Sequence, residues 1–374
     1  MEIVYDDAGL ARAMEELSRF GSLGREGGLS AERPVLIDRF LEDAIEVDVD
    51  AIRDATGDVV IAGVMEHVEE AGVHSGDSAC VIPPPTLPAI AVEALELHTR
   101  NIAGALDVRG LVNVQYAVKA GQVFVIEANP RASRTVPFVA KATGVPWAKV
   151  AARVMVGATL AELRGEGLLR DPVWGSHVSV KEAVLPFDRF PDVDTVLGPE
   201  MRSTGEVMGI DHTYGLSFAK SQIAAGDPLP AGGTVFLSLA DRDKAAGLEV
   251  ARRFRDLGFA IAATSGTARH LRDAGVAVAV EVAKVGEREG RADAVELIGS
   301  GRVQLVVNTP RGRGPRADGA HIRRAANVGN VACLTTIAAA RAAAAGIADW
   351  ATHPLAVLSL QEYHRGEQLR LPLE

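Results

Sequence analysis

The side chains best suited to chemistry lie in one short stretch, between Glu127 and Arg134. Glu127 and Asn129 are two residues apart, so in extended backbone their side chains point to the same face. A carboxylate and a carboxamide presented together suit Mg²⁺, which prefers hard oxygen ligands and completes its shell with phosphate oxygens and water. Arg131 and Arg134 follow directly, and a guanidinium group held there could bind an anion through two parallel hydrogen bonds. The same spacing also fits an ordinary strand that ends in a salt-bridged turn.

Two neighbouring strands are needed to position this stretch. The apolar run at residues 123–126 predicts a buried strand that ends at Glu127, and residues 112–118 predict a second strand. A hairpin around residues 119–122 would place Gln115 beside Glu127. The pattern therefore adds a second carboxamide to the predicted metal site.

The residues around this predicted metal site resemble a motif of a known enzyme family. Gln115 followed by Ile-Glu-x-Asn-Pro-Arg-x-Ser-Arg-Thr at residues 126–135 resembles the metal and phosphate site of ATP-grasp enzymes. Its continuation through residue 144 resembles the large chain of carbamoyl-phosphate synthetase, and this similarity extends almost to the C-terminus. The resemblance implies ATP with Mg²⁺ (or Mn²⁺) bound at three side chains, Gln115, Glu127 and Asn129. It also implies a catalytic site formed by Asn129, Arg131 and Arg134, in which the arginines hold the anionic substrate.

Residues 44–51 alternate apolar and acidic side chains, which predicts a strand with a solvated face formed by Glu46, Asp48 and Asp50. The resemblance instead places Glu46 on the nucleotide side, where related enzymes hold the ribose hydroxyls. It gives Asp48 and Asp50 no such role. It also assigns four consecutive residues to the ATP pocket, namely Gly72, Val73, His74 and Ser75.

The resemblance further implies a site for the amino-acid effector ornithine, whose cationic amine suits acidic side chains. The matching positions are Glu69, Asp77 and Glu182. A lone glutamate on a strand, such as Glu182, is ordinarily exposed. Its assignment to this site therefore depends on the resemblance alone.

Bulk composition narrows the class of protein. The 374 residues are 48% hydrophobic, which is ample for two or three packed domains. A net charge of −10 argues against nucleic acid as the main partner. No apolar run reaches the roughly 18 residues of a membrane span, and the N-terminus lacks a secretory-signal pattern. With only Cys80 and Cys333, no disulfide framework is indicated, and we expect a cytoplasmic protein.

The pattern changes after the Gly- and Pro-rich segment at residues 226–233. Short apolar strands, including those at 276–280 and 303–307, then alternate with helices, which predicts a doubly wound parallel sheet. In such sheets ligands bind outside the carboxyl ends of the strands. Residues 264–267 leave a strand and open a helix, so they either cradle a phosphate or form an ordinary helix cap.

This region resembles the methylglyoxal-synthase-like regulatory domain that closes the synthetase large chain. The nucleotide monophosphate effector implied by the resemblance is UMP or IMP. Its contacts fall on matching positions, namely Lys244, Thr264, Thr267, Lys284, Asn308 and Thr309. The arginine-rich run at 311–316 fits a loop.

The expected fold class is α/β and α+β, with a partial ATP-grasp domain followed by a doubly wound methylglyoxal-synthase-like domain. We expect the C-terminal part of an ATP-grasp domain at 1–157, a connecting segment completing the synthetase half at 158–229, and an allosteric domain at 230–374. Residues 7–20 predict a helix and residues 35–40 a strand. The Gly-Pro linker suggests that residues 234–374 fold independently.

By resemblance, the chain starts inside the second ATP-grasp unit of a large chain. Met1 would then be an internal methionine, a misplaced start or an artificial boundary. A chain with one lobe of an ATP clamp should expose an apolar patch where the opposite lobe packs, and we expect it to be inactive alone.

The implied activity is ATP-dependent phosphorylation of carbamate to carbamoyl phosphate, within a glutamine-hydrolysing synthetase of arginine and pyrimidine biosynthesis. Implied partners are a glutaminase small chain and the N-terminal part of the large chain, with bicarbonate and ammonia as substrates. Two alternatives stay open. One is another ATP-grasp ligase such as a biotin carboxylase, which the pattern after residue 233 argues against. The other is a non-catalytic fragment that binds effectors or supports assembly.

Overall fold

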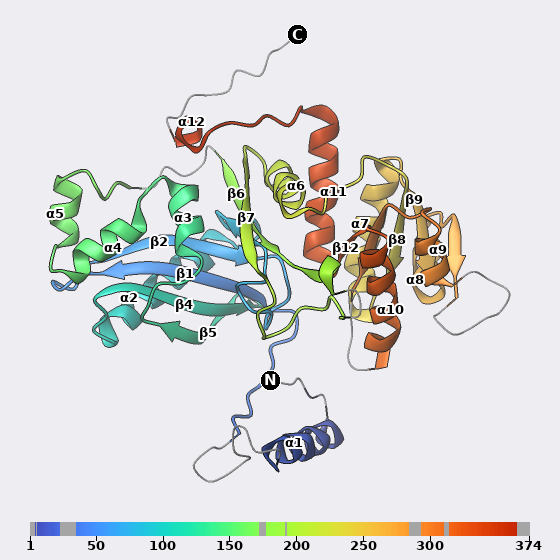
Figure 1. Cartoon of the computed structure of the whole chain (residues 1–374), viewed down its shortest axis with the longest axis horizontal. Coiled ribbons are helices and arrows are strands. Elements are labelled where there is room, and N and C mark those ends of the chain that lie inside the picture. The colour runs from blue at the N-terminus through green and yellow to red at the C-terminus, as the bar shows by residue number, and fades with distance from the viewer. Residues whose placement is uncertain are drawn as a thin grey trace. The chain divides into compact units, whose positions relative to one another are not determined.

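The computed structural model describes residues 4, 6–22, 35–171, 177–190, 193–283, 293–309 and 314–364 (Figure 1). Lys284 and residues 311–313 lie outside the described residues. Contacts within the chain define two units, Met1–Asp43 and Ala44–Glu374. None of the described helices is long and apolar enough to cross a membrane.

The first unit contains helix α1 (Asp7–Ser22), which confirms the helix predicted at 7–20. The strand predicted at residues 35–40 is wrong, because this segment has no regular structure. Leu36 and Ile37 in it are exposed. A strand requires a neighbouring strand for its backbone hydrogen bonds, and an apolar run alone does not provide one.

The second unit begins with an antiparallel sheet of seven strands in the order β5-β4-β1-β2-β3-β6-β7. The strands are β1 (Ile45–Arg53), β2 (Val59–His67), β3 (Cys80–Ile82), β4 (Gly110–Lys119), β5 (Gln122–Asn129), β6 (Val178–Val184) and β7 (Gly205–Asp211). A 3-10 helix, η1 (Phe187–Arg189), follows β6.

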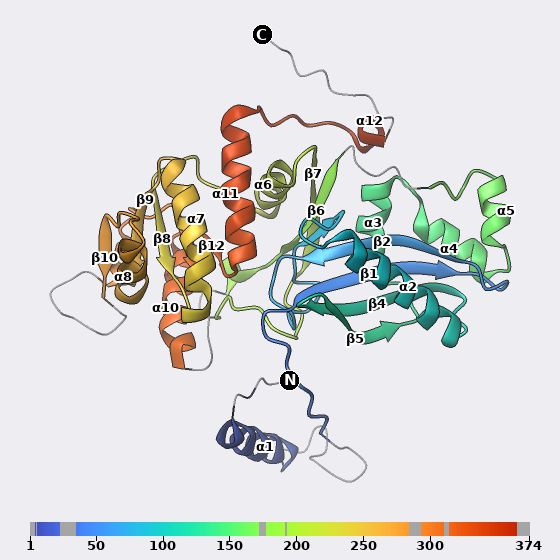
Figure 2. The same ribbon diagram turned by 180° about the vertical axis from the view of Figure 1, so that it is seen from behind.

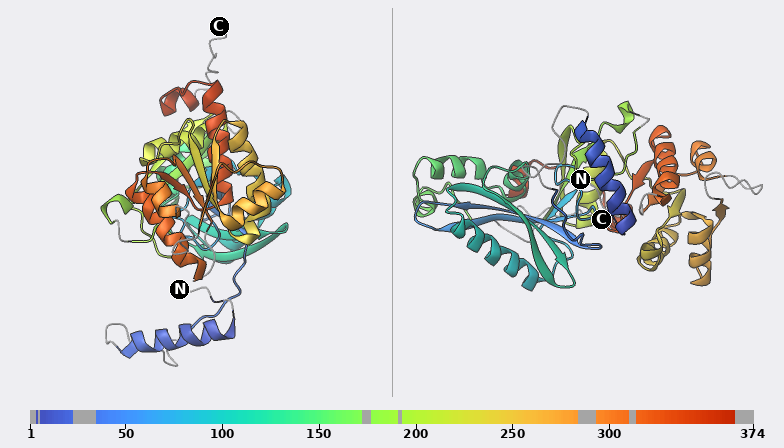
Figure 3. Two further views of the ribbon diagram at one scale, coloured as in Figure 1. Left: turned by 90° about the vertical axis from the view of Figure 1, so that its right-hand side faces the viewer. Right: turned by 90° about the horizontal axis from the view of Figure 1, so that it is seen from below.

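Helices cover both faces of this sheet, as Figure 3 shows in its right-hand view. On one face, α2 (Ala89–Ala105) buries Leu95 against Val47 and Val49 of β1. On the other face, Met65 and Ile82 pack against a group of three helices. These are α3 (Val136–Thr143), α4 (Trp147–Met155) and α5 (Leu160–Gly165).

Strand β5 forms an edge of this sheet, and its burial differs from the prediction. Phe124, Val125 and Ile126 are all exposed, so the prediction of a buried strand at 123–126 is wrong. The apolar run does pair with β4, and Val123 packs against the core beneath α2, but the next three side chains are left exposed. These exposed side chains match the apolar patch expected where the opposite lobe of an ATP clamp would pack. The packing of such a lobe on them stays a prediction.

A second sheet has five parallel strands in the order β10-β9-β8-β11-β12. They are β8 (Thr234–Ser238), β9 (Ala260–Thr264), β10 (Val280–Val282), β11 (Leu305–Asn308) and β12 (Ala332–Leu334). The predicted doubly wound sheet is confirmed, because the chain winds outward from β8 in both directions. Strands β10 and β11 begin a few residues later than the apolar runs at 276 and 303 suggest.

Both faces of the parallel sheet carry helices, as a doubly wound fold requires. Helices α7 (Lys244–Asp256), α8 (Ser265–Asp273) and α11 (Ile337–Thr352) pack on one face, and α9 (Ala294–Gly299) and α10 (Gly314–Val328) on the other. The short η2 (Asp241–Asp243) leads into α7.

The two sheets share one hydrophobic core through helices α6 (Tyr214–Ala225) and α11, which lie side by side in Figures 1 and 2. That core contains Val81 and Val180 from the first sheet and Leu237 and Val307 from the second. Residues 234–374 therefore bury apolar surface against the rest of the unit. That residues 234–374 also fold independently stays a prediction.

The end of the described chain returns to the first sheet. We call residues 353–364, which include α12 (Leu360–His364), the C-terminal strap. Tyr363 Oη donates a hydrogen bond to the Ile210 carbonyl at 2.9 Å, and His364 Nε2 lies 2.7 Å from the Lys141 carbonyl at the end of α3. The strap therefore links the segment after α11 to both β7 and α3.

Candidate functional site

A row of polar side chains crosses one face of the antiparallel sheet. Directly paired residues in antiparallel strands present their side chains on the same face. The strand register gives two series of neighbours, Glu127–Gln115–Asp48 and Asn129–Asn113–Asp50. We call these six residues the polar row. The predicted hairpin is confirmed, since Gln115 pairs directly with Glu127.

The outer end of the polar row carries the predicted metal ligands. Asn129 Nδ2 donates to Glu127 Oε1 at 2.8 Å, so Glu127 is bonded to the carboxamide and not to an arginine. Gln115, Glu127 and Asn129 supply a single carboxylate. The described residues contain no cluster of three His, Cys, Asp or Glu side chains that could hold a metal alone. The set therefore fits a Mg²⁺ ion that shares its shell with phosphate oxygens.

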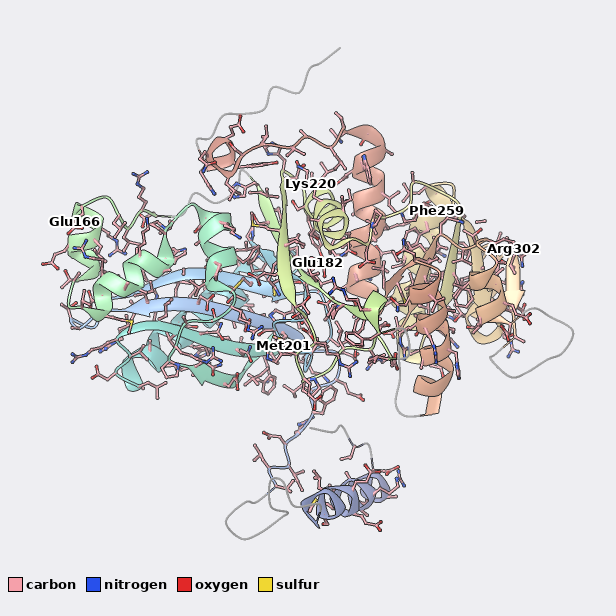
Figure 4. The ribbon with its side chains drawn as sticks, viewed as in Figure 1. Glu166, Glu182, Met201, Lys220, Phe259 and Arg302 are labelled. Carbon is pink, nitrogen blue, oxygen red and sulfur yellow. The ribbon has the colours of Figure 1, made fainter. Side chains whose placement is uncertain are left out.

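The two predicted anion-binding arginines follow on the turn into α3. Both guanidinium groups are exposed, which leaves them accessible to a substrate. Arg131 Nη1 donates to the Ala132 carbonyl at 3.2 Å, and Arg134 reaches the sulfur of Met201. Met201 is labelled in Figure 4. The segment 198–206 thus contacts the turn that carries both arginines.

The inner end of the polar row is buried, so the solvated face predicted for β1 is wrong. Glu46, Asp48 and Asp50 are only 5%, 1% and 1% exposed. His67 of β2 lies between two of them, with Nδ1 3.9 Å from Glu46 Oε1 and Nε2 3.4 Å from Asp48 Oδ2. Burial raises the pKa of Glu46, although His67 and the Gly72 amide oppose the shift.

Glu46 also contacts the predicted nucleotide loop. The Gly72 amide donates to Glu46 Oε2 at 2.8 Å. Further along the loop, His74 Nδ1 accepts from the Gly76 amide at 2.9 Å, and the Ser75 carbonyl accepts from Lys181 Nζ at 3.0 Å. The structure therefore brings Glu46 and the start of the run 72–75 together, as the nucleotide-pocket prediction requires.

The three predicted effector-site acids line one cavity of about 460 Å³, at the junction of the two sheets. Figure 4 shows Glu182 at this junction. Glu69 Oε2 accepts from the Ala79 amide at 2.5 Å, and Glu182 Oε2 accepts from Gln222 Nε2 at 2.6 Å. Burial raises the pKa of both glutamates, and for Glu182 the charge of Glu69 adds to the shift.

Asp77 is the most constrained of these acids. Its two oxygens accept the backbone amides of Arg202, at 2.7 Å, and Ser203, at 2.9 Å. Asp77 therefore anchors the segment 198–206, a role that the sequence did not indicate.

The predicted nucleotide-effector residues gather at the carboxyl ends of the parallel strands, with Lys284 outside the described residues. Thr267 Oγ1 accepts the Leu239 amide at 3.0 Å, and Thr309 Oγ1 accepts the Ala240 amide at 2.9 Å. Thr264 lies 3.3 Å from Thr267, hydroxyl to hydroxyl. Two residues predicted to contact the nucleotide, Thr267 and Thr309, therefore fix the backbone of the loop that follows β8.

Two more of these residues have partners of their own. Lys244 Nζ lies 2.6 Å from Asp241 Oδ1. Asn308 Oδ1 accepts from Nη1 of the fully buried Arg323 at 2.7 Å, and the same guanidinium binds both oxygens of Asp194 at 2.8 and 2.7 Å. Sequence reasoning missed this contact, because an arginine on an amphipathic helix ordinarily points to water.

The family described as "Carbamoyl-phosphate synthase L chain, ATP binding domain" matches residues 6–163, and the family described as "MGS-like domain" matches residues 246–335. The chain thus contains two regions of known type, one similar to the ATP-binding domain of carbamoyl-phosphate synthase large chains and one similar to MGS-like domains. Both parts agree with the fold class predicted from the sequence.

Curated relatives of known function match almost the whole chain. The carbamoyl phosphate synthase large chain of Acidobacterium capsulatum is 50% identical over 99% of this chain and 33% of its own length. Those of Mycobacterium bovis and Gemmatimonas aurantiaca are each 52% identical, over 98% and 100% of this chain and 33% and 32% of their own lengths. The chain therefore resembles the C-terminal third of a carbamoyl phosphate synthase large chain.

Solved structures give more distant likenesses. The biotin carboxylase domain of the Hydrogenobacter thermophilus 2-oxoglutarate carboxylase, in complex with MgADP and bicarbonate, has a TM-score of 0.46 at 13% identity, covering 60% of this chain and 52% of that one. Biotin carboxylase from Campylobacter jejuni has a TM-score of 0.40 at 14% identity, covering 53% and 41%.

Proposed function

We propose that the chain supplies an ATP site for carbamate phosphorylation in a carbamoyl phosphate synthase, together with its regulatory domain. The observation that carries the proposal is the register of β4 and β5, which puts Gln115, Glu127 and Asn129 together at an exposed sheet edge. Two exposed arginines follow directly. Phosphoryl transfer requires mainly positioning and charge neutralisation, and this set of side chains supplies both.

Each side chain has a distinct part in this proposal. Gln115, Glu127 and Asn129 would hold Mg²⁺ (or Mn²⁺) and the ATP phosphates, while Arg131 and Arg134 would orient the carbamate anion. A bound metal ion would neutralise charge on the phosphoryl group in transfer. The buried Glu46 and the loop 72–75 would position the nucleoside.

The wider assignment rests on relatives three times as long as this chain. In it, carbamoyl phosphate is made in the cytoplasm for arginine and pyrimidine biosynthesis, from bicarbonate and from ammonia that a glutaminase small chain releases. Ornithine would occupy the acid-lined cavity, and UMP or IMP the carboxyl ends of β8, β9 and β11. The MGS-like match disfavours a biotin carboxylase. A non-catalytic effector-binding fragment is the remaining alternative.

The test compares Glu127→Gln with a matched control, Glu166→Gln, which alters an exposed glutamate of an ion pair with Arg153. Each protein is combined with a companion that supplies the rest of a large chain, and carbamoyl phosphate formation from ATP and carbamate is measured. We expect Glu127→Gln to lower the rate about 10²-fold or more, because charge stabilisation is lost, while the control stays near wild type.

Three outcomes separate the alternatives. Near-normal turnover by a folded Glu127→Gln assembly would contradict the metal-ligand role. Robust synthesis by the purified chain without a companion would contradict the expectation that it is inactive alone. An inactive wild-type assembly that still binds ornithine or UMP would favour the non-catalytic alternative.

A further inference from the structure

Asp50 forms the buried end of the polar row, and it connects parts of the chain that are distant in sequence. Its carboxylate accepts hydrogen bonds from three side chains. Asn113 Nδ2 and Ser133 Oγ donate to Oδ1 at 2.9 and 2.8 Å, and Thr135 Oγ1 donates to Oδ2 at 2.6 Å. The hydroxyls of Ser133 and Thr135 also lie 2.7 Å apart. Asp50 and its donors therefore form one closed network.

These partners bracket the predicted anion-binding turn. Ser133 and Thr135 stand on either side of Arg134, and Thr135 directly precedes α3. Asn113 pairs in register with Asn129, where the same turn begins. One carboxylate on β1 thus accepts hydrogen bonds from the residues on both sides of Arg134, while the arginines of the turn are themselves exposed.

A purely space-filling role would not require an acid at this position. Burial raises the pKa of Asp50 to about 6, against the hydrogen bonds from Thr135 and Asn113. An apolar side chain would fill the same volume without a buried charge. What the carboxylate adds is two acceptor oxygens aimed at three donors, and hence a fixed conformation of the turn.

We propose that Asp50 is a positioning residue, which fixes the backbone on both sides of Arg134 and thereby sets where Arg131 and Arg134 meet the anionic substrate. The part of this inference that concerns the substrate rests on the proposed function. The part that concerns the turn does not.

The first experiment measures amide hydrogen exchange at residues 131–136 in the purified 374-residue chain. The variants are Asp50→Asn and, from the turn side, Ser133→Ala and Thr135→Val, which test the same contacts if Asp50→Asn fails to fold. The control is Asp48→Asn, an equally buried acid of the same strand and face whose near neighbour is His67. We expect about tenfold faster exchange in the turn, the effect of losing one hydrogen bond to a charged group. The control should leave the turn unchanged.

The second experiment measures carbamate and ATP kinetics in the assembled enzyme. If the turn positions the arginines, Thr135→Val should raise KM for carbamate about tenfold and leave KM for ATP unchanged, because the metal ligands lie outside the network. A merely structural role would not separate the two KM values.

The outcomes distinguish this inference from the proposed function. Exchange that is unchanged at 131–136, or that rises equally throughout the first sheet, would overturn the positioning role. Equal changes in the two KM values would overturn its link to the substrate. If the wild-type assembly does not use carbamate, the proposed function fails, while locally faster exchange would still support the fixing of the turn.

Discussion

Replacing Arg323 by methionine should loosen the contact between the two sheets. This guanidinium is fully buried, and it binds both oxygens of Asp194, in the segment after η1, and the side chain of Asn308 at the end of β11. Methionine fills a similar volume but donates no hydrogen bond. Asp194 and Asn308 would then both lose the guanidinium donor, while Asp194 Oδ1 would keep the bond from the Val196 amide.

The size of the expected loss in unfolding free energy follows from the burial of the ion pair. Removing one partner of a fully buried ion pair costs about 3–5 kcal/mol. Asp194 is 36% exposed, so water can partly solvate it and lower that cost. The lost donor to Asn308 adds about 1–3 kcal/mol. We therefore expect Arg323→Met to lower the free energy of unfolding by about 3 kcal/mol.

Urea denaturation followed by fluorescence measures this loss. The control is Arg341→Met, which removes an exposed ion pair with Glu249 and should cost at most about 1 kcal/mol. In a double-mutant cycle, Asp194→Ala combined with Arg323→Met should cost clearly less than the sum of the single changes. Additive losses, or an Arg323→Met cost no larger than that of Arg341→Met, would refute the buried-clamp reasoning.

Three further predictions concern packing, charge and exposure. A Cβ on Gly346 of α11 would lie 2.6 Å from a backbone oxygen of α6. Gly346→Ala should therefore lower the thermal midpoint by the equivalent of roughly 1–2 kcal/mol. The control Gly104→Ala places its methyl group in open space on α2 and should not lower the midpoint. Burial and the charge of Glu69 raise the folded-state pKa of Glu182, so this carboxyl stabilises the fold at low pH and loses that contribution as pH rises through the raised pKa. Denaturation between about pH 5 and pH 9 should therefore show wild type losing stability relative to Glu182→Gln, and a constant difference would contradict this. Val125 is 53% exposed on the edge strand, so Val125→Thr should change the unfolding free energy by less than about 0.5 kcal/mol, and a much larger loss would mean that the strand is covered.

The sequence was most informative where structure is local. The short apolar runs around residues 119–122 predicted a hairpin, and the register confirms the pairing of Gln115 with Glu127. Alternating strands and helices after residue 233 predicted the parallel sheet correctly, because strand and helix periodicities are local properties.

Burial was predicted less well, because it depends on partners far along the chain. Val125 is apolar but lies at a sheet edge, while Asp50 is acidic but is covered by donors 63 to 85 residues away. Arg323 and Asp194 are 129 positions apart, so no window of sequence contains both. The roles of these side chains follow from the tertiary fold alone.

The C-terminal strap has a consequence for how the chain is made. A ribosome releases α3 early, but the histidine that caps the Lys141 carbonyl at its end, His364, is synthesised 223 residues later. Gly144, just after α3, lies so close to the His364 ring that a Cβ there would collide with it at 2.8 Å. During synthesis α3, the helix that follows the arginine turn, therefore lacks the His364 contact at its C-terminal end until the strap has been made. The contact between α3 and the C-terminal strap can form only after α12, the last described helix, has been synthesised.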